Sequence, residues 1–255
     1  MPAQFDTLHV EIDARGVALL TLNRPAVLNA FNRALFDDLT TALESINDNE
    51  AARVVVITGA GDRAFSAGGD IGEMSQATTQ EQEHFAMRFT ECCWTLANYR
   101  LPTIGAINGL AYGGGGLLAT ALDIRIGCER SKFKFLGVQY DRINATWSLP
   151  MIVGWPHAKE LLFSARVVAA EEALRLNLLN HVVPAERLME STMALALQIA
   201  GNPPRMVQGA KQILTAAIGA SWEAMLEIEQ EAIQTRLAPG PAKESFAAFL
   251  ERKSD

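Results

Sequence analysis

Four consecutive glycines, Gly113 to Gly116, are the feature of this sequence most suited to chemistry. They follow an apolar run that begins at Pro102 and precede an alanine- and leucine-rich run from Leu117, which predicts a buried strand and then a helix. The glycines therefore lie at a helix start, where free N–H groups and a partial positive charge favour an anion or a developing oxyanion. For a glycine run by itself, close packing of the strand against the helix is the simpler explanation.

A second glycine-bearing loop, 64–71, includes Ala67, Gly68 and Gly69 and follows another predicted strand. That strand, 54–58, is an unbroken β-branched run after a helix, which is typical of strands buried on both faces of a parallel sheet. Ligands of such sheets bind beyond the carboxyl ends of the strands, so we expect the two glycine loops to converge. Two N–H groups aimed at one carbonyl oxygen would form an oxyanion hole, which stabilises an enolate or a tetrahedral intermediate.

The elements that would position these loops are strands alternating with helices. Two β-rich segments, 7–12 and 16–22, predict an N-terminal hairpin, and an amphipathic helix begins between Asn29 and Asn32. Its predicted apolar side consists of Leu35, Phe36, Leu39, Leu43 and Ile46. The remaining predicted strands are 54–58, 102–108 and 123–128, and the predicted helices between them are 79–99 and 117–122. Strands and helices thus alternate, as in an α/β domain. After Pro156 we expect no strands and helices at 158–163, 170–176, 187–200, 205–218, 221–236 and 243–253.

Composition excludes several classes of function. The 255 residues are 49% hydrophobic and carry a net charge of −7, so nucleic acid and anionic membrane surfaces are not expected partners. The three cysteines show no C-x-x-C spacing, and the four histidines are scattered, so we expect a reducing cytoplasm and no metal site. We expect no secretory leader, because the first residues lack a basic and then apolar pattern, and no membrane span, because no apolar run reaches about 18 residues. No dinucleotide or P-loop fingerprint follows any strand, so no nucleotide cofactor is expected.

Several segments together resemble the enoyl-CoA hydratase/isomerase, or crotonase, superfamily, nearly from end to end. The matching segments are Leu22 to Pro25, Leu28 to Ala30, Val55 to Gly59, Ala64 to Ile71, Ala106 to Gly109 with Gly113 to Gly115, Leu149-Pro150 and Ala247 to Lys253. The resemblance implies an α/β fold built as a crotonase-like ββα spiral, with an acyl-CoA-binding core at 1–200. It also implies a helical C-terminal oligomerisation region at 201–255, a homotrimer or a dimer of trimers, and an acyl-CoA substrate without a separate cofactor.

The resemblance also assigns site residues. By motif position, the oxyanion-hole donors would be the backbone N–H groups of Ala67 and Gly114, acting on a thioester oxygen. Arg24 and the pair Arg252-Lys253 match positions that could contact the CoA phosphates, although solvated surface charge explains them equally well. The further positions that it places around the substrate are Ala64, Gly68, Gly69, Asp70 and Leu117.

The sequence departs from the family at the two glutamates that a hydratase carries. Leu117 stands at the first position, and the second falls near Gly137 or Val138. Adding water to an enoyl thioester requires a base for the water and an acid for the α-carbon, which leucine and glycine cannot supply. Asp141 is the only carboxylate between Glu129 and Glu160, so as a hypothesis it acts as a single base suited to an isomerase. A surface turn is the alternative interpretation of its charged pair with the next residue.

Three functions remain open at this point. The first is enoyl-CoA hydratase/isomerase-type chemistry through a thioester enolate. The second is other CoA-thioester chemistry at the same oxyanion hole, by a hydrolase, decarboxylase or lyase. The third is a non-catalytic acyl-CoA-binding protein that lost both glutamates. Glu73, facing the acyl group, and Tyr140, as a proton donor, are further candidates.

Overall fold

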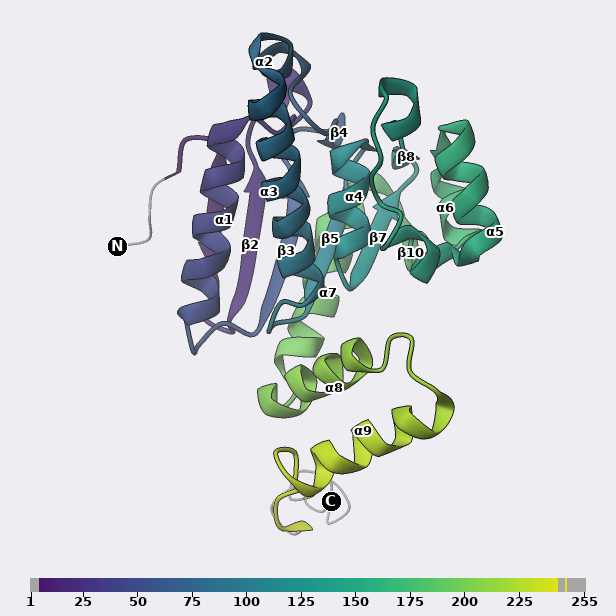
Figure 1. Ribbon diagram of the computed structural model, residues 1–255. Helices are drawn as coiled ribbons and strands as arrows, with labels where there is room; N and C mark the ends of the chain where they lie inside the picture. Colours follow the sequence, from purple (N-terminus) through teal and green to yellow (C-terminus); the bar gives the residue numbers. More distant parts are fainter. Residues whose placement is uncertain (1–4, 243–245, 247–255) are drawn as a thin grey trace. The chain divides into compact units, whose positions relative to one another are not determined.

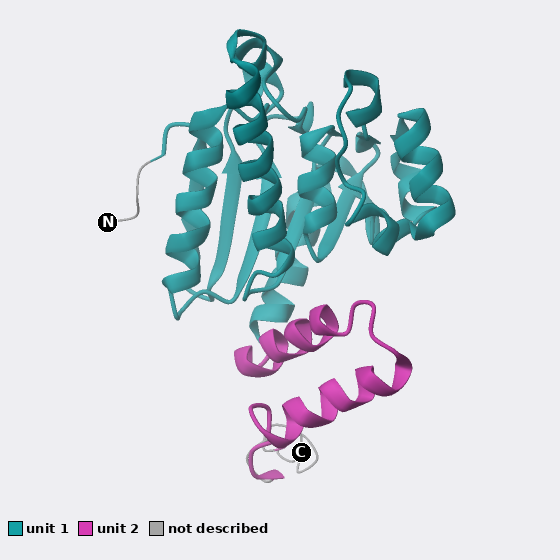
Figure 2. Cartoon of the chain, in the orientation of Figure 1, with its two compact units in different colours: residues 1–201 teal, residues 202–255 magenta. Residues whose placement is uncertain are grey.

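The computed structural model describes residues 5–242 and residue 246. The chain divides into two compact units, Met1–Gly201 and Asn202–Asp255, which Figure 2 shows in different colours. None of the helices in the described ranges is both long and apolar enough to cross a lipid bilayer.

Among the described residues, six strands of the first unit form a sheet in the order β1-β2-β3-β5-β7-β10. β1 and β2 are the predicted antiparallel hairpin, and the other neighbouring pairs are parallel. The bounds are Leu8–Ile12 (β1), Val17–Leu22 (β2), Val54–Gly59 (β3), Thr103–Ile107 (β5), Ile124–Cys128 (β7) and His181–Val183 (β10). Because β3 and β5 are parallel neighbours, the two glycine-bearing segments leave the sheet from the same edge.

A second, smaller sheet carries those segments. Its order is β4-β6-β8-β9, with bounds Ala64–Ser66 (β4), Leu110–Tyr112 (β6), Lys132–Lys134 (β8) and Val168–Ala169 (β9). β4, β6 and β8 pair in parallel, and each follows directly on a strand of the large sheet. Helices come next in every case, so the chain repeats a strand-strand-helix unit, and the glycine segments expected to be loops each begin with a three-residue strand.

Helices cover both faces of the large sheet. In Figure 1, α1 (Arg33–Asp48), α3 (Thr79–Ala97) and α4 (Gly114–Ala121) lie on one face and α7 (Leu188–Ala200) on the other. β3 explains the two layers, because alternate side chains of a strand point to opposite faces. Val55 and Ile57 pack into the apolar cluster of α1 and α3, whereas Val54 and Val56 pack into that of α7. The continuous apolar run in β3 is therefore buried throughout.

Shorter elements complete the two units. The first unit also contains α2 (Ile71–Gln76), α5 (Leu149–Ser164), α6 (Ala170–Arg175) and the 3-10 turns Pro25–Val27 (η1), Gly137–Tyr140 (η2) and Ala185–Arg187 (η3). The second unit contains α8 (Pro204–Ala216) and α9 (Trp222–Gln234). A Cβ on Gly209 would lie 2.5 Å from a methyl carbon of Leu237, so a larger residue there would require the Leu237 side chain to move.

Most predicted elements are confirmed. The first helix buries all five predicted apolar residues. The absence of strands after residue 156 is wrong, because β9 and β10 form there. These strands have two and three residues, too few to show a period, and they form only by pairing with β8 and β7. The predicted helix at 243–253 falls almost wholly outside the described residues.

Candidate active site

A cavity of about 360 Å³ opens where the loops after β4 and β6 meet. Its walls come from those loops, from α2, from one residue of α3 and from the segment around η2. The lining residues are Ala67, Gly69, Ile71, Met74, Ser75, Gln82, Gly113, Gly114, Leu136, Gly137, Tyr140, Arg142 and Asn144. The two glycine loops therefore converge at one cavity, as the sequence predicted.

Gly68 brings the two loops into backbone contact. Its φ is +92°, and a Cβ built on it would lie 2.7 Å from the Gly114 nitrogen and 2.8 Å from the Tyr112 oxygen. Both neighbours are backbone atoms, which cannot move aside as a flexible side chain can. Glycine is therefore required here both for its backbone conformation and for space.

The second loop presents free N–H groups at the start of α4. The first hydrogen bond of this helix runs from the Leu117 N–H to the Gly113 oxygen at 3.1 Å. The N–H groups of Gly114, Gly115 and Gly116 consequently have no acceptor within the helix. Gly115 is buried against Ser66, whereas Gly114 lines the cavity. The Gly114 amide thus lies where a ligand oxygen can reach it, beside the partial positive charge of the helix start.

The structure does not leave the Ala67 amide free, although the sequence assigned it as the first donor. Its N–H donates to the Leu28 oxygen at 2.9 Å. That bond helps to hold the loop against the segment before α1, so the Ala67 amide serves the fold in this structure. Ala67 lines the cavity only through its remaining atoms.

The Gly69 amide is free instead. Phe31 and Gly69 form an isolated parallel bridge, in which the Phe31 N–H donates to the Gly68 oxygen and the Asp70 N–H donates to the Phe31 oxygen. In such a bridge the N–H of the central residue points away from its partner strand. Accordingly, none of the described residues accepts a hydrogen bond from the Gly69 N–H, and Gly69 lines the cavity.

Gly68 is the physical reason for this difference. In a regular strand the N–H groups of residues 67 and 69 would point the same way, because the backbone has a period of two. The positive φ of Gly68 reverses the chain between them. As a result Ala67 points at Leu28, while Gly69 points away from the same neighbouring segment.

Arg24 and Asp70 hold the first loop in place. The Arg24 Nη1 lies 2.8 Å from Asp70 Oδ2 and also donates to the Ala30 oxygen, and both charged side chains are mostly buried. Asp70 Oδ1 accepts from the first N–H groups of α2. Burial raises the pKa of Asp70, but hydrogen bonds from Arg24 and the α2 backbone, with the Arg24 charge, outweigh it and lower that pKa overall. Neither side chain lines the cavity, so a contact of Arg24 with CoA phosphates stays a prediction.

Asn29 is a structural residue whose contacts the sequence analysis missed. It is fully buried, accepts from the Arg24 N–H, and donates to the Ala60 and Ala64 oxygens. Ala64 is buried as well and lies outside the cavity lining, so the structure gives it a role in the fold. The motif at Leu28 to Ala30 was visible in the sequence, but its bonding partners are 31 and 35 residues away.

The two positions at which a hydratase carries glutamates differ in kind. Leu117 is 2% exposed and belongs to the apolar core, outside the cavity lining. Gly137 does line the cavity, and a Cβ on it would lie 2.7 Å from the Arg142 backbone oxygen. The Arg142 N–H also donates to the Gly137 oxygen at 2.9 Å, so the segment folds back on this glycine. The lining residues include no aspartate, glutamate or histidine.

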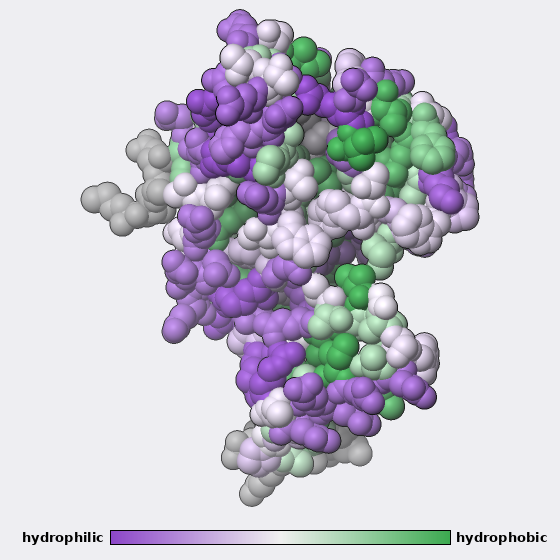
Figure 3. Space-filling model, in the orientation of Figure 1, coloured by the Kyte–Doolittle hydropathy of each residue, from purple (hydrophilic) through white to green (hydrophobic). Residues whose placement is uncertain are grey.

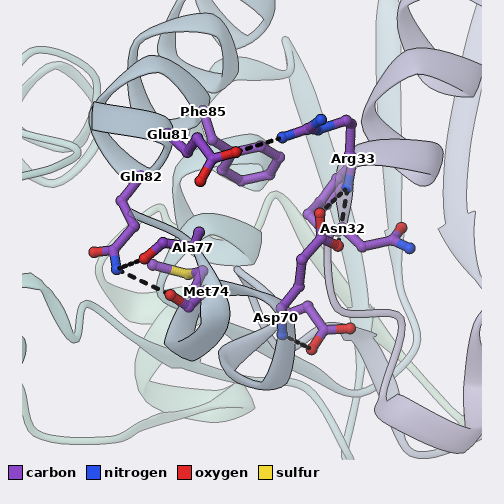
Figure 4. Close-up of a pocket in the computed structure, with 10 residues that line it drawn as sticks. Asn32, Arg33, Asp70, Met74, Ala77, Glu81, Gln82 and Phe85 are labelled. Carbon is purple, nitrogen blue, oxygen red and sulfur yellow. Dashed lines mark hydrogen bonds and ion pairs between the residues drawn. The ribbon is translucent and has the colours of Figure 1, made fainter. Parts of the chain in front are cut away.

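The remaining carboxylate candidates lie elsewhere. Asp141 is exposed, ends η2 with a left-handed backbone and does not line the cavity. Glu73 lines a separate void of about 30 Å³, drawn in Figure 4, and accepts from the Arg33 N–H. Tyr140 does line the cavity and is 61% exposed. Lys253 lies outside the described residues.

Polar residues that the sequence analysis missed complete the cavity wall. Arg142 donates from Nη2 to Gln82 Oε1 at 2.7 Å. The buried Oδ1 of Asn144 accepts no hydrogen bond from any described residue, and it lies beside Gly137. Buried polar atoms are normally hydrogen-bonded, so this unpaired oxygen is an exception among the described residues. No local motif marked Arg142 or Asn144, because the fold of the segment brings them to the cavity.

Comparison with known proteins identifies the family and the fold of the chain. The chain is 33% identical to a short-chain-enoyl-CoA hydratase of Clostridium acetobutylicum, over 93% of this chain and 92% of the relative. It is 32% identical to a crotonyl-CoA hydratase of Syntrophomonas wolfei, with the same coverage. The crystal structure of an enoyl-CoA hydratase from Bacillus anthracis superposes with a TM-score of 0.93 at 31% identity, covering 97% of each chain. The Enoyl-CoA hydratase/isomerase family model matches residues 13–255. The chain therefore has the crotonase fold and belongs to the enoyl-CoA hydratase/isomerase family.

Proposed function

We propose that this protein acts on acyl-CoA thioesters and holds the thioester oxygen between the backbone N–H groups of Gly69 and Gly114. The observation that carries the proposal is that Gly69 and Gly114, from two remote loops, line one cavity, and that neither N–H has an acceptor among the described residues. Two donors aimed at one oxygen stabilise the enolate of a thioester, which is the chemistry expected of an enoyl-CoA hydratase/isomerase. Gly69 replaces Ala67 in this role because the Ala67 N–H is bonded to Leu28.

Each part of the site has a defined task in this proposal. Gly114 supplies an amide at the start of α4, where the helix dipole favours a developing negative charge. Gly68 sets the spacing between the two donors through its contact with the Gly114 nitrogen. The ion pair of Arg24 with Asp70 keeps the first loop from relaxing when the oxygen binds. Preorganised donors of this kind cost no reorganisation during the reaction.

The proposal is tested by replacing single amides with esters. An α-hydroxy acid at position 69 or 114 removes one N–H and leaves the side chain unchanged, and the same exchange at position 67 is the matched control. The measurement is the infrared stretching frequency of the ¹³C-labelled thioester carbonyl in bound crotonyl-CoA. We expect hydrogen bonding to lower this frequency, and the shift to diminish for the esters at 69 and 114 but not at 67. Loss of the shift at 67 alone would restore Ala67 as the donor.

A second candidate follows from the absence of carboxylates in the cavity lining. Each missing general acid or base costs about 10²–10⁴-fold in rate, so hydration has no obvious catalyst here. Decarboxylation of a malonyl-type thioester, whose carboxylate is bonded to the α-carbon, needs no base. When the bond between the α-carbon and the carboxylate breaks, its electron pair forms the thioester enolate as CO₂ departs. The α-carbon then takes one proton, for which the Tyr140 hydroxyl or water is available.

One assay series separates these candidates. Hydration of crotonyl-CoA at an ordinary enzymatic rate would support hydratase chemistry and show that other groups replace the glutamates. Release of CO₂ from malonyl-CoA without hydration would support the second candidate. Tight binding of acyl-CoA with no turnover of any acyl group tested would indicate a non-catalytic acyl-CoA-binding protein.

We also propose that the protein forms a homotrimer or a dimer of trimers through its C-terminal region, 201–255. Figure 3 shows apolar side chains gathered on this unit. The exposed ones include Leu214 at 71%, Ile218 at 58% and Trp222 at 88%. Large exposed apolar areas usually mark interaction surfaces. Light scattering after size exclusion is expected to give three or six times 27.7 kDa, and a monomer would contradict this proposal.

A further inference from the structure

We infer that the acyl group of the substrate carries a second carboxylate, which Arg142 binds at the exposed rim of the cavity. This inference rests on the proposed function, because it assumes that an acyl thioester occupies the site. It concerns the substrate class, and the glycine amides alone do not address it.

The charge of the cavity wall is the first argument. Arg142 is the only lining residue with a formal charge at neutral pH, and it forms no ion pair with a described residue. The chain as a whole carries a net charge of −7, so acidic residues outnumber basic ones. A shortage of carboxylates therefore does not explain why Arg142 has no ion-pair partner among the described residues. An unpaired cation in an otherwise uncharged cavity is complementary to an anionic ligand group.

The positioning of Arg142 is the second argument. Its Nη2 donates to Gln82 Oε1, and Gln82 Nε2 in turn donates to the Met74 and Ala77 oxygens at 2.9 and 3.1 Å. Figure 4 shows the two bonds from Gln82 to Met74 and Ala77, which hold the Gln82 amide against the C-terminal end of α2. The guanidinium is thus held at one edge while its other N–H groups remain available. Arginine presents these groups as a planar fork that matches a carboxylate.

Asn144 gives the cavity a direction. Its unpaired, buried Oδ1 lies 3.3 Å from the place that a Cβ on Gly137 would occupy. An acceptor oxygen repels an anion, whereas it accepts a hydrogen bond from a hydroxyl, an amide or a water molecule. A carboxylate is therefore disfavoured at Gly137 and favoured at Arg142. Decarboxylation is one reaction that such a substrate could undergo, but the binding inference does not depend on it.

The test uses two acyl-CoA pairs of equal chain length that differ in a terminal carboxylate, succinyl-CoA with butyryl-CoA and malonyl-CoA with propionyl-CoA. Dissociation constants are measured by calorimetry for the native protein and for Arg142→Gln. Because Arg142 is exposed, we expect the native protein to bind at least one carboxylated probe roughly 2–5-fold more tightly than its partner. Arg142→Gln should abolish that preference, and Arg142→Lys should retain part of it. Arg130→Gln is the control for net charge, because Arg130 does not line the cavity.

The outcomes separate this inference from the proposed function. If both members of each pair bind equally to the native protein, the inference is overturned while acyl-CoA binding stands. If Arg142→Gln weakens both members equally, Arg142 serves the CoA portion, and the inference is also overturned. If no acyl-CoA binds, the proposed function fails as well. Circular dichroism and the melting temperature show whether the variant is folded, and Arg142→Lys provides the comparison if it is not.

Discussion

The close approach of Gly68 to the Gly114 nitrogen makes Gly68→Ala the sharpest perturbation of the candidate site. The added methyl would lie 2.7 and 2.8 Å from two backbone atoms, whereas ordinary contact begins at 3.4 Å. The loops must therefore separate by roughly 0.5–1 Å. The residue would also have to adopt a φ of +92°, which is strained for alanine. We expect a loss of about 2–4 kcal/mol in stability from strain and overpacking together.

The effect on function should be larger than stability alone explains. The separation moves the Gly69 and Gly114 amides apart, and a misplacement of about 1 Å costs on the order of 10²-fold in rate. The assay is kcat/KM for whichever acyl-CoA is turned over, with the infrared shift of the bound thioester carbonyl as a readout that needs no turnover. We expect kcat/KM to fall about 10–100-fold and the infrared shift to decrease.

Gly61→Ala is the matched control for this prediction. Gly61 has a similar φ of +79°, but a Cβ there would meet only the Pro25 side chain, at 3.5 Å. This variant should lose about 1–2 kcal/mol from backbone strain, a melting-temperature decrease of roughly 2–8 °C, with kcat/KM unchanged. If Gly68→Ala is destabilised but matches Gly61→Ala in kcat/KM and in the infrared shift, the reasoning about the two loops is refuted.

Three further predictions concern the carboxylates and the loop that holds the first donor. Gly137→Glu should not restore crotonyl-CoA hydration, because its Cβ would collide with the Arg142 oxygen and displace the segment; a rise of tenfold or more would contradict this. Asp141→Asn should leave acyl-CoA turnover unchanged, since Asp141 is exposed and outside the cavity lining, and a large loss of kcat would reinstate it as a base. Asp70→Asn should destabilise the protein at pH 7, because hydrogen bonds and the charge of Arg24 lower the folded-state pKa of Asp70. That stabilisation is present above the unfolded pKa of about 3.9 and is lost as the pH falls through the folded pKa, so chemical unfolding should show the two proteins converging in acid and diverging toward neutral pH.

The predictions that succeeded depended on local patterns. The run at 54–58 identified a strand covered on both faces, and the spacing of Leu35 to Ile46 identified the buried side of α1. The strands after residue 156 were missed because β9 and β10 are short and exist only through pairing with distant segments. Arg142 and Asn144 were missed for a related reason. Their place in the cavity depends on the turn that folds back onto Gly137.

The sequence by itself determined that two glycine loops follow buried strands and that one of them starts a helix, because glycine content and apolar periodicity act over a few residues. Tertiary structure alone decided which amides are free. The Ala67 N–H finds its acceptor at Leu28, and the positive φ of Gly68 turns the Gly69 N–H away from the same segment. The direction of a backbone amide depends on a dihedral angle and on a partner distant in sequence, and neither is encoded in the residue that carries the amide.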